Sequence, residues 1–155
     1  ARNLDRIILL TGDGDFIRLV IALQNMGCRV DVIGFNNVSH DLKEAADSYL
    51  SGFLIPGLLP LHSENGSRLR GIPVNYNPDR GFGFLKYYRL KKEGLLQETV
   101  FFHCSQSNVS HDNVFLDSAN IFEFSIATNP ENDNRTEAQE ISLLEEKSMN
   151  IFRSS

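Results

Sequence analysis

The sequence predicts a parallel α/β half-domain followed by a domain built from β-strands. Residues 6–10 are a continuous apolar run, residues 30–35 are a second strand-like segment, and a helical spacing of apolar residues at 16–23 lies between them. The order strand, helix, strand requires a parallel sheet. Further along, ring-bearing side chains alternate with other residues at 82–84 and 101–103, which is typical of strands with two different faces.

The first sixty residues contain signals for two strands and two helices. Asp13 or Asp15 can cap the first helix, and Gly27 ends it. Ser39 is a suitable cap for a second helix, whose inner face then extends to Tyr49. The sequence therefore predicts a βαβα unit with two parallel strands.

An acidic loop follows the first predicted strand. In open parallel sheets the reactive site lies at the carboxyl ends of the strands, where Asp13 and Asp15 are placed by the sequence. Two carboxylates with no basic residue between them are hard oxygen ligands suited to Mg²⁺ or Mn²⁺. The alternative is helix capping together with a favourable interaction with the helix dipole, which explains one aspartate better than the second.

Three segments of this half resemble an NYN domain of the LabA-like type, which has a PIN-like nuclease fold. Residues 9–16 resemble its signature loop, residues 27–34 the next strand and residues 42–49 the last helix. The resemblance implies a PIN/Rossmann-like half-domain and metal-dependent cleavage of RNA. It assigns Asp13 and Asp15 as catalytic acids that bind Mg or Mn.

The same resemblance implies an earlier strand that ends in an aspartate, with further acids from elements before the signature loop. Such elements are expected to lie outside the 155 residues. The expected partner is therefore the N-terminal half of the NYN domain or a second protomer. We expect the chain alone to be inactive or nearly so, because two acids supply only part of the oxygen shell of Mg²⁺.

The second half carries rings suited to stacking on bases. If the two motif strands are neighbours, their rings cover one face of the sheet, and each stacked base contributes roughly 1–3 kcal/mol. Gly81 and Gly83 are expected to leave the adjacent backbone uncovered. The alternative is a Phe-rich barrel core. The rings in question are Phe82, Phe84, Phe101 and His103.

Residues 71–142 resemble a cold-shock domain, a five-stranded OB-type barrel that binds single-stranded RNA or DNA. The resemblance rests on residues 71–77, on the motif at 79–84 and on the motif at 100–103. It implies stacking by the four rings named above, with Tyr76 beside them.

The charge of the chain is net negative, at −5, but the charges are unevenly distributed. Residues 63–128 are neutral, and four cations are expected in a loop between the two ring motifs. Such a cluster attracts phosphates locally, and Lys86 and Lys91 are the candidate contacts. The alternative is a solvated loop that keeps the barrel soluble. The four cations are Lys86, Arg89, Lys91 and Lys92.

Composition favours a cytoplasmic location. No apolar run approaches the roughly 20 residues of a membrane span, and the two cysteines, Cys28 and Cys104, fall in different predicted domains. Reduced thiols are therefore expected rather than a disulfide framework.

These observations predict a single-stranded RNA-binding protein that is a fragment of a metal-dependent ribonuclease of NYN/PIN type. The alternative is a non-catalytic nucleic-acid-binding regulator, in which the NYN part serves as a scaffold for protein interaction. The predicted parts are the NYN portion at 1–62, a linker at 63–70, the barrel at 71–145 and a tail at 146–155.

Overall fold

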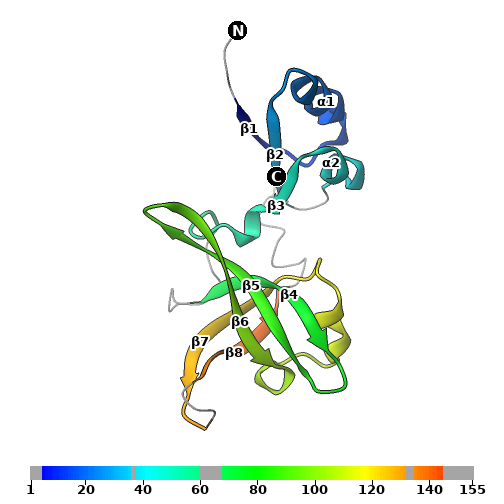
Figure 1. The fold of residues 1–155 in the computed structure, drawn as a ribbon. Helices are drawn as coiled ribbons and strands as arrows, with labels where there is room; N and C mark the ends of the chain where they lie inside the picture. The colour runs from blue at the N-terminus through cyan, green and yellow to red at the C-terminus, as the bar shows by residue number, and fades with distance from the viewer. Residues whose placement is uncertain (1–4, 36–37, 60–67, 132–134, 145–155) are drawn as a thin grey trace, which may run out of the picture. The chain divides into compact units, whose positions relative to one another are not determined.

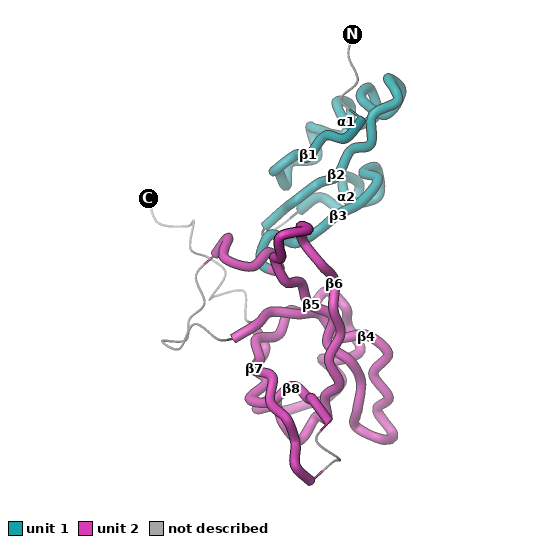
Figure 2. The backbone as a smooth tube through the Cα atoms, turned by 60° about the vertical axis from the view of Figure 1, so that its left-hand side comes forward, with its two compact units in different colours: residues 1–53 teal, residues 54–155 magenta. Residues whose placement is uncertain are grey.

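A computed structural model describes residues 5–35, 38–59, 68–131 and 135–144. The chain divides into two compact units, residues 1–53 and residues 54–155 (Figure 2). Most of the predicted linker at 63–70 and all of the predicted tail at 146–155 lie outside the described residues.

The first unit contains a three-stranded parallel sheet in the order β1-β2-β3 (Figure 1). This confirms the predicted parallel α/β half-domain. Its elements are β1 (Arg6–Leu10), η1 (Gly14–Phe16), α1 (Ile17–Asn25), β2 (Arg29–Gly34), α2 (His40–Ala45) and β3 (Ser48–Ser51), followed by η2 (Gly52–Leu54).

The core of this unit lies between the helices and one face of the sheet. Val20 of α1, Val32 of β2 and Leu42 of α2 are all fully buried in it. Ile8 and Leu10 of β1 belong to the other face, because side chains alternate along a strand, and they are 52% and 65% exposed. Within the described residues, this face of the sheet has no helical layer of its own.

The third strand corrects the sequence prediction of a helix that extends to Tyr49. The helix ends at Ala45, and Ala46 already has an extended backbone. Asp47 then binds the backbone of Val30 twice: its N–H donates to the Val30 carbonyl at 2.9 Å, and its carboxylate accepts from the Val30 N–H at 2.7 Å. These bonds align residues 48–51 with β2, and Tyr49 reaches the core from a strand.

The second unit is a closed five-stranded barrel with the strand order β4-β5-β6-β8-β7, and β7 pairs back with β4 (Figure 1). The predicted all-β five-stranded barrel is confirmed, and one of its strand pairings, that of β6 with β8, is parallel. Its elements are β4 (Leu69–Asn77), β5 (Phe82–Lys91), β6 (Gly94–His103), η3 (Cys104–Gln106), η4 (Asp112–Leu116), β7 (Phe122–Asn129) and β8 (Arg135–Leu143).

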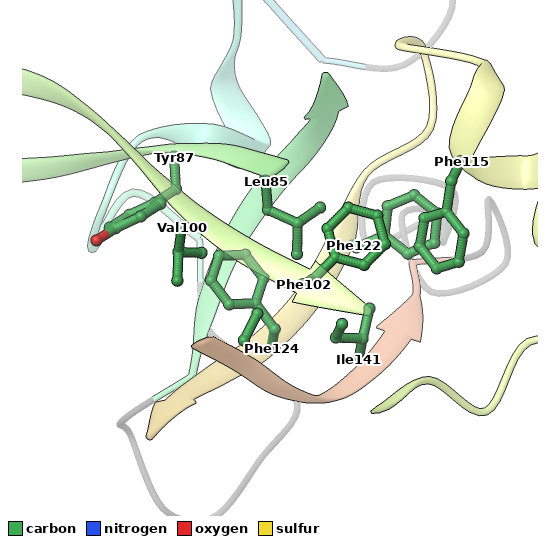
Figure 3. Close-up of a cluster of buried hydrophobic side chains, with 9 residues drawn as sticks. Leu85, Tyr87, Val100, Phe102, Phe115, Phe122, Phe124 and Ile141 are labelled. Carbon is green, nitrogen blue, oxygen red and sulfur yellow. The ribbon is translucent and has the colours of Figure 1, made fainter. Parts of the chain in front are cut away.

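Aromatic rings fill the interior of the barrel (Figure 3). Phe102 of β6 and Phe122 of β7 are fully buried, and Phe115 of η4 lies against both, with ring centroids 4.7 Å and 4.6 Å away. Large buried rings contribute much of the apolar area that stabilises a small domain. The 3-10 turn η4 therefore closes one end of this core.

The segment between the two ring motifs is not the loop that the sequence predicted. β5 and β6 form a long antiparallel hairpin, paired without interruption from Phe82↔His103 to Lys91↔Gly94. Gly94 has a φ of +118°, which suits the tight turn at Lys92 and Glu93. The described part of the chain contains no helix with the length and apolarity that a membrane crossing demands.

Candidate nucleic-acid interface and acidic loop

Four rings share the outer face of the β5–β6 hairpin, which we call the ring face. Phe82 lies opposite His103, and Phe84 lies opposite Phe101. The residues between them on each strand, such as Phe102, point into the core and are buried. The two faces of the hairpin therefore separate into an aromatic core side and an aromatic outer side.

The rings of this face contact one another. The centroid of Phe101 is 5.7 Å from that of Phe82 and 6.0 Å from that of Phe84. Phe84 is 37% exposed, and the other three are half-buried. The guanidinium of Arg135, from β8, lies 5.4 Å from the centre of the Phe101 ring. Sequence reasoning missed Arg135, because only the parallel pairing of β6 with β8 places it there.

The orientation of the His103 ring is set by a local turn. The backbone N–H of Ser105 donates to His103 Nδ1 at 3.2 Å, and the Ser105 hydroxyl lies 2.8 Å from the same nitrogen. Because Nδ1 accepts the backbone hydrogen bond, a neutral ring carries its proton on Nε2. The imidazole is thus held in one position next to Phe82.

The two glycines of the first motif have roles different from the expected one. Both are buried, so they do not leave the backbone uncovered. Gly81 has a φ of +68°, and its N–H donates to the Asn77 carbonyl at 2.8 Å to close the β4–β5 turn. A Cβ at Gly83 would lie 2.9 Å from Tyr76 Cα and 3.2 Å from the Phe102 ring. Gly83 therefore permits close packing beneath the ring face.

Tyr76 is not on the ring face but behind it. Its ring stacks on Phe102 at a centroid distance of 5.8 Å and contacts Phe115 at 5.2 Å. Its hydroxyl donates to Asp112 Oδ2 at 2.7 Å, and burial followed by this hydrogen bond raises the pKa of the phenol. Tyr76 thus joins η4 to the barrel wall.

The cations of the hairpin lie on opposite faces. Lys86 is two residues after Phe84 on β5, so its side chain belongs to the same face, and it is paired with Thr99 across the strands. Lys91 belongs to the opposite face of β5, where its Nζ lies 3.0 Å from Glu98 Oε1. The structure therefore brings Lys86, but not Lys91, to the side of the hairpin that carries the rings.

Glu98 is the centre of a hydrogen-bonded network that sequence reasoning missed. It accepts from Lys91, from the Tyr87 hydroxyl at 2.8 Å and from Arg89 Nε at 2.9 Å. These bonds, with Lys91 first and Tyr87 next, lower the pKa of the Glu98 carboxyl to about 2. In the hairpin register Glu98 lies opposite Tyr87, and Arg89 and Lys91 follow on the same face of β5, so the network becomes visible only when the register is known.

The acidic loop of the first unit connects β1 to η1 at the carboxyl edge of the sheet. Asp13 caps η1, since its Oδ1 accepts from the Asp15 N–H at 2.9 Å. The Asp13 N–H donates to Thr11 Oγ1 at 3.2 Å, and the Ser39 N–H donates to the Gly12 carbonyl at 3.1 Å. Both aspartates are exposed. Capping accounts for the Asp13 carboxylate, whereas none of the described hydrogen bonds uses the Asp15 carboxylate.

This loop does not by itself fit a complete divalent-metal site. Among the described residues there is no group of three or more His, Cys, Asp or Glu side chains close enough to hold a metal ion. Asp13 and Asp15 supply two carboxylates from one loop, and Mg²⁺ requires near-octahedral oxygen coordination. Any metal bound here needs further ligands from outside this set.

Comparison with known proteins supports the interpretation of the first unit. Residues 1–59 match the sequence profile of the NYN domain. Searches of curated proteins and of solved structures returned no match. The molecule therefore combines an NYN domain, a domain of the PIN-like nuclease type, with a five-stranded β-barrel.

Proposed function

We propose that the protein binds single-stranded RNA through the ring face of its barrel. The observation that carries this proposal is the set of four adjacent rings on the outer side of β5 and β6, with the core on the other side. Rings at a protein surface stack on unpaired bases without regard to sequence. The bases of a duplex are already stacked on one another, so single strands are the better ligand.

The topology of the barrel supports the same function. Its strand order β4-β5-β6-β8-β7 is closed, with consecutive antiparallel hairpins and one parallel contact between β6 and β8. We infer an OB-type barrel of the cold-shock kind from this order together with the two ring motifs. In OB-type barrels the face around the second and third strands binds oligonucleotides, and here that is the face of β5 and β6.

Titration of a labelled single strand tests this function. Phe82→Ala is expected to weaken binding by about 1–3 kcal/mol, because it removes one stacking ring. Lys92→Ala, at the hairpin turn, is the matched control and is expected to have a smaller effect. Equal affinity for duplex and single strand, or a larger effect of Lys92→Ala than of Phe82→Ala, would contradict the proposal.

We infer a second function, RNA cleavage, for the NYN domain when its acid set is completed. The match of residues 1–59 favours it, and NYN nucleases use divalent metals as a family. The uncovered sheet face at Ile8 and Leu10 is where a further segment of the NYN fold, or a second protomer, would pack. Asp13 and Asp15 would then contribute two acids to a larger site.

Cleavage is tested by supplying an upstream NYN segment, in the same chain or as a separate partner. Mn²⁺-dependent cleavage of a single-stranded RNA is expected only with the added segment, and Asp13→Asn is expected to abolish it. Glu44→Gln is the control, because Glu44 is an exposed acid on α2 that pairs with His40. Strong cleavage by the 155 residues alone would contradict the inference. Absence of cleavage in every combination would favour the non-catalytic regulator.

A further inference from the structure

The outer face of the β5–β6 hairpin continues beyond the ring face. Phe84↔Phe101 is followed by Lys86↔Thr99 and then by Tyr88↔Gln97 in an unbroken antiparallel register. Because successive side chains alternate, Tyr88 belongs to the same face as Phe84, whereas Tyr87 points into the core and is 5% exposed. The half-buried Tyr88 is thus one more ring at regular spacing on this outer face.

We propose that Tyr88 is a further base-stacking residue, and that bound single-stranded RNA extends from the ring face along the hairpin towards its turn. The proposal rests on the proposed RNA-binding function and extends its site. Tyr88 is four residue steps along an antiparallel strand from Phe84, which corresponds to about 14 Å. That distance leaves room for bases and phosphates between the two rings.

The charges of the hairpin favour RNA as the occupant of this extension. Lys86 lies between Phe84 and Tyr88 on the shared face and can contact a phosphate. The acid of the hairpin centre, Glu98, lies on the opposite face, where Lys91 and Arg89 neutralise it. The extension therefore offers a ring, a cation and a second ring, without a carboxylate among them.

The hairpin is also stiffened at the level of Tyr88. The adjacent Tyr87 is anchored in the core, and its hydroxyl donates to Glu98 across the strands at 2.8 Å. Arg89 lies over the Tyr87 ring, 5.4 Å from its centre, and also binds Glu98. A ring on a fixed backbone loses less conformational freedom on binding than a ring on a flexible loop.

Length dependence of RNA binding tests this extension. The probes are labelled homopolymeric RNAs of about four and about twelve nucleotides, which span the range of site sizes of OB-type barrels. Tyr88→Ala is expected to weaken binding of the longer RNA by about 5- to 150-fold and to leave the shorter one unchanged. Phe84→Ala is expected to weaken both. Tyr88→Phe, which keeps the ring, is expected to bind both as the natural chain does.

The control is Leu96→Ala, which truncates an exposed apolar residue of the same hairpin on its other face. It should leave both affinities unchanged. Thermal unfolding of every variant shows whether the hairpin remains folded, and Tyr88→Leu provides an apolar, non-aromatic side chain should the alanine variant unfold. Tyr88→Leu is expected to reproduce the loss for the longer RNA.

Each other outcome overturns a defined part of the argument. If Phe84→Ala weakens binding but neither Tyr88→Ala nor Tyr88→Leu changes the affinity for the longer RNA, the extension is wrong and RNA binding by the ring face stands. If Tyr88→Ala weakens both lengths equally, or Leu96→Ala has the same effect, the extended path is wrong. If the natural chain binds neither RNA, the proposed function itself fails.

Discussion

Replacing Phe101 and Phe102 one at a time separates binding from folding, because these neighbours lie on opposite faces of β6. Phe102 is fully buried and contacts the rings of Tyr76 and Phe115. Phe102→Ala is expected to destabilise the fold by about 3–5 kcal/mol, the usual cost of removing a buried Phe. For a domain of about 100 residues, this corresponds to a fall in Tm of roughly 12–40 °C.

Phe101→Ala is expected to act mainly on RNA binding. It removes one stacking ring, worth about 1–3 kcal/mol, and also the ring that contacts both Phe82 and Phe84. We therefore expect a loss of binding free energy in the upper part of that range, about 2–3 kcal/mol. This loss corresponds to an increase in Kd of about 30- to 150-fold. Two surface ring contacts contribute about 1–3 kcal/mol to stability, so the fall in Tm should be smaller than that of Phe102→Ala.

The assay combines thermal unfolding with titration of a labelled single strand at a temperature where both variants are folded. The reasoning is refuted if folded Phe102→Ala binds more weakly than Phe101→Ala. It is also refuted if Phe101→Ala lowers Tm more than Phe102→Ala, because the assignment of the two faces would then be reversed.

Three further predictions concern packing, pH and capping. Gly83→Ala should destabilise the barrel by about 1–3 kcal/mol in urea unfolding, because the new Cβ would lie 2.9 Å from Tyr76 Cα; unchanged stability would contradict this. Glu98 has its carboxyl pKa lowered from 4.5 to about 2, so its stabilisation is present above pH 4.5 and is lost as the pH falls through about 2. Glu98→Gln should therefore lower stability at neutral pH, and its difference from the natural chain should vanish below about pH 2. Asp13→Ala should cost about 0.5–2 kcal/mol through loss of a cap, whereas Asp15→Ala should change stability by less than about 0.5 kcal/mol; similar costs in chemical denaturation would argue against the capping geometry.

Local patterns predicted the elements that depend on local physics. The apolar run at 6–10 and the cap at Ser39 predicted β1 and the start of α2, since burial periodicity and capping act over a few residues. Alternation at 82–84 and 101–103 predicted that four rings share one face, and the register of β5 with β6 places them together. No distant partner was needed for these inferences.

Features that depend on distant partners could not be predicted in this way. The position of Tyr49 is compatible with helical spacing as well as with a strand. The hydrogen bonds of Asp47 to Val30, which align the following residues with β2, decide for the strand. Arg135 lies 34 residues after Phe101 in the sequence and reaches it only because β8 pairs with β6. The role of Gly83 depends on how closely Tyr76 approaches it, which no local pattern records.

The construction of the hairpin explains how a small barrel can carry rings on its outer face without losing its fold. Each outer ring is adjacent in sequence to a core residue, so the strand that presents Phe101 is anchored by Phe102. Gly83 lets Tyr76 pack directly behind the hairpin, which fixes the backbone beneath Phe82 and Phe84. Rings held in this way are ordered before a ligand arrives, so less conformational entropy is lost on binding. In the same way, the buried Tyr87 anchors the part of β5 that carries Tyr88. The stiffness that stabilises the barrel therefore also favours an extended stacking surface along the outer side of β5 and β6.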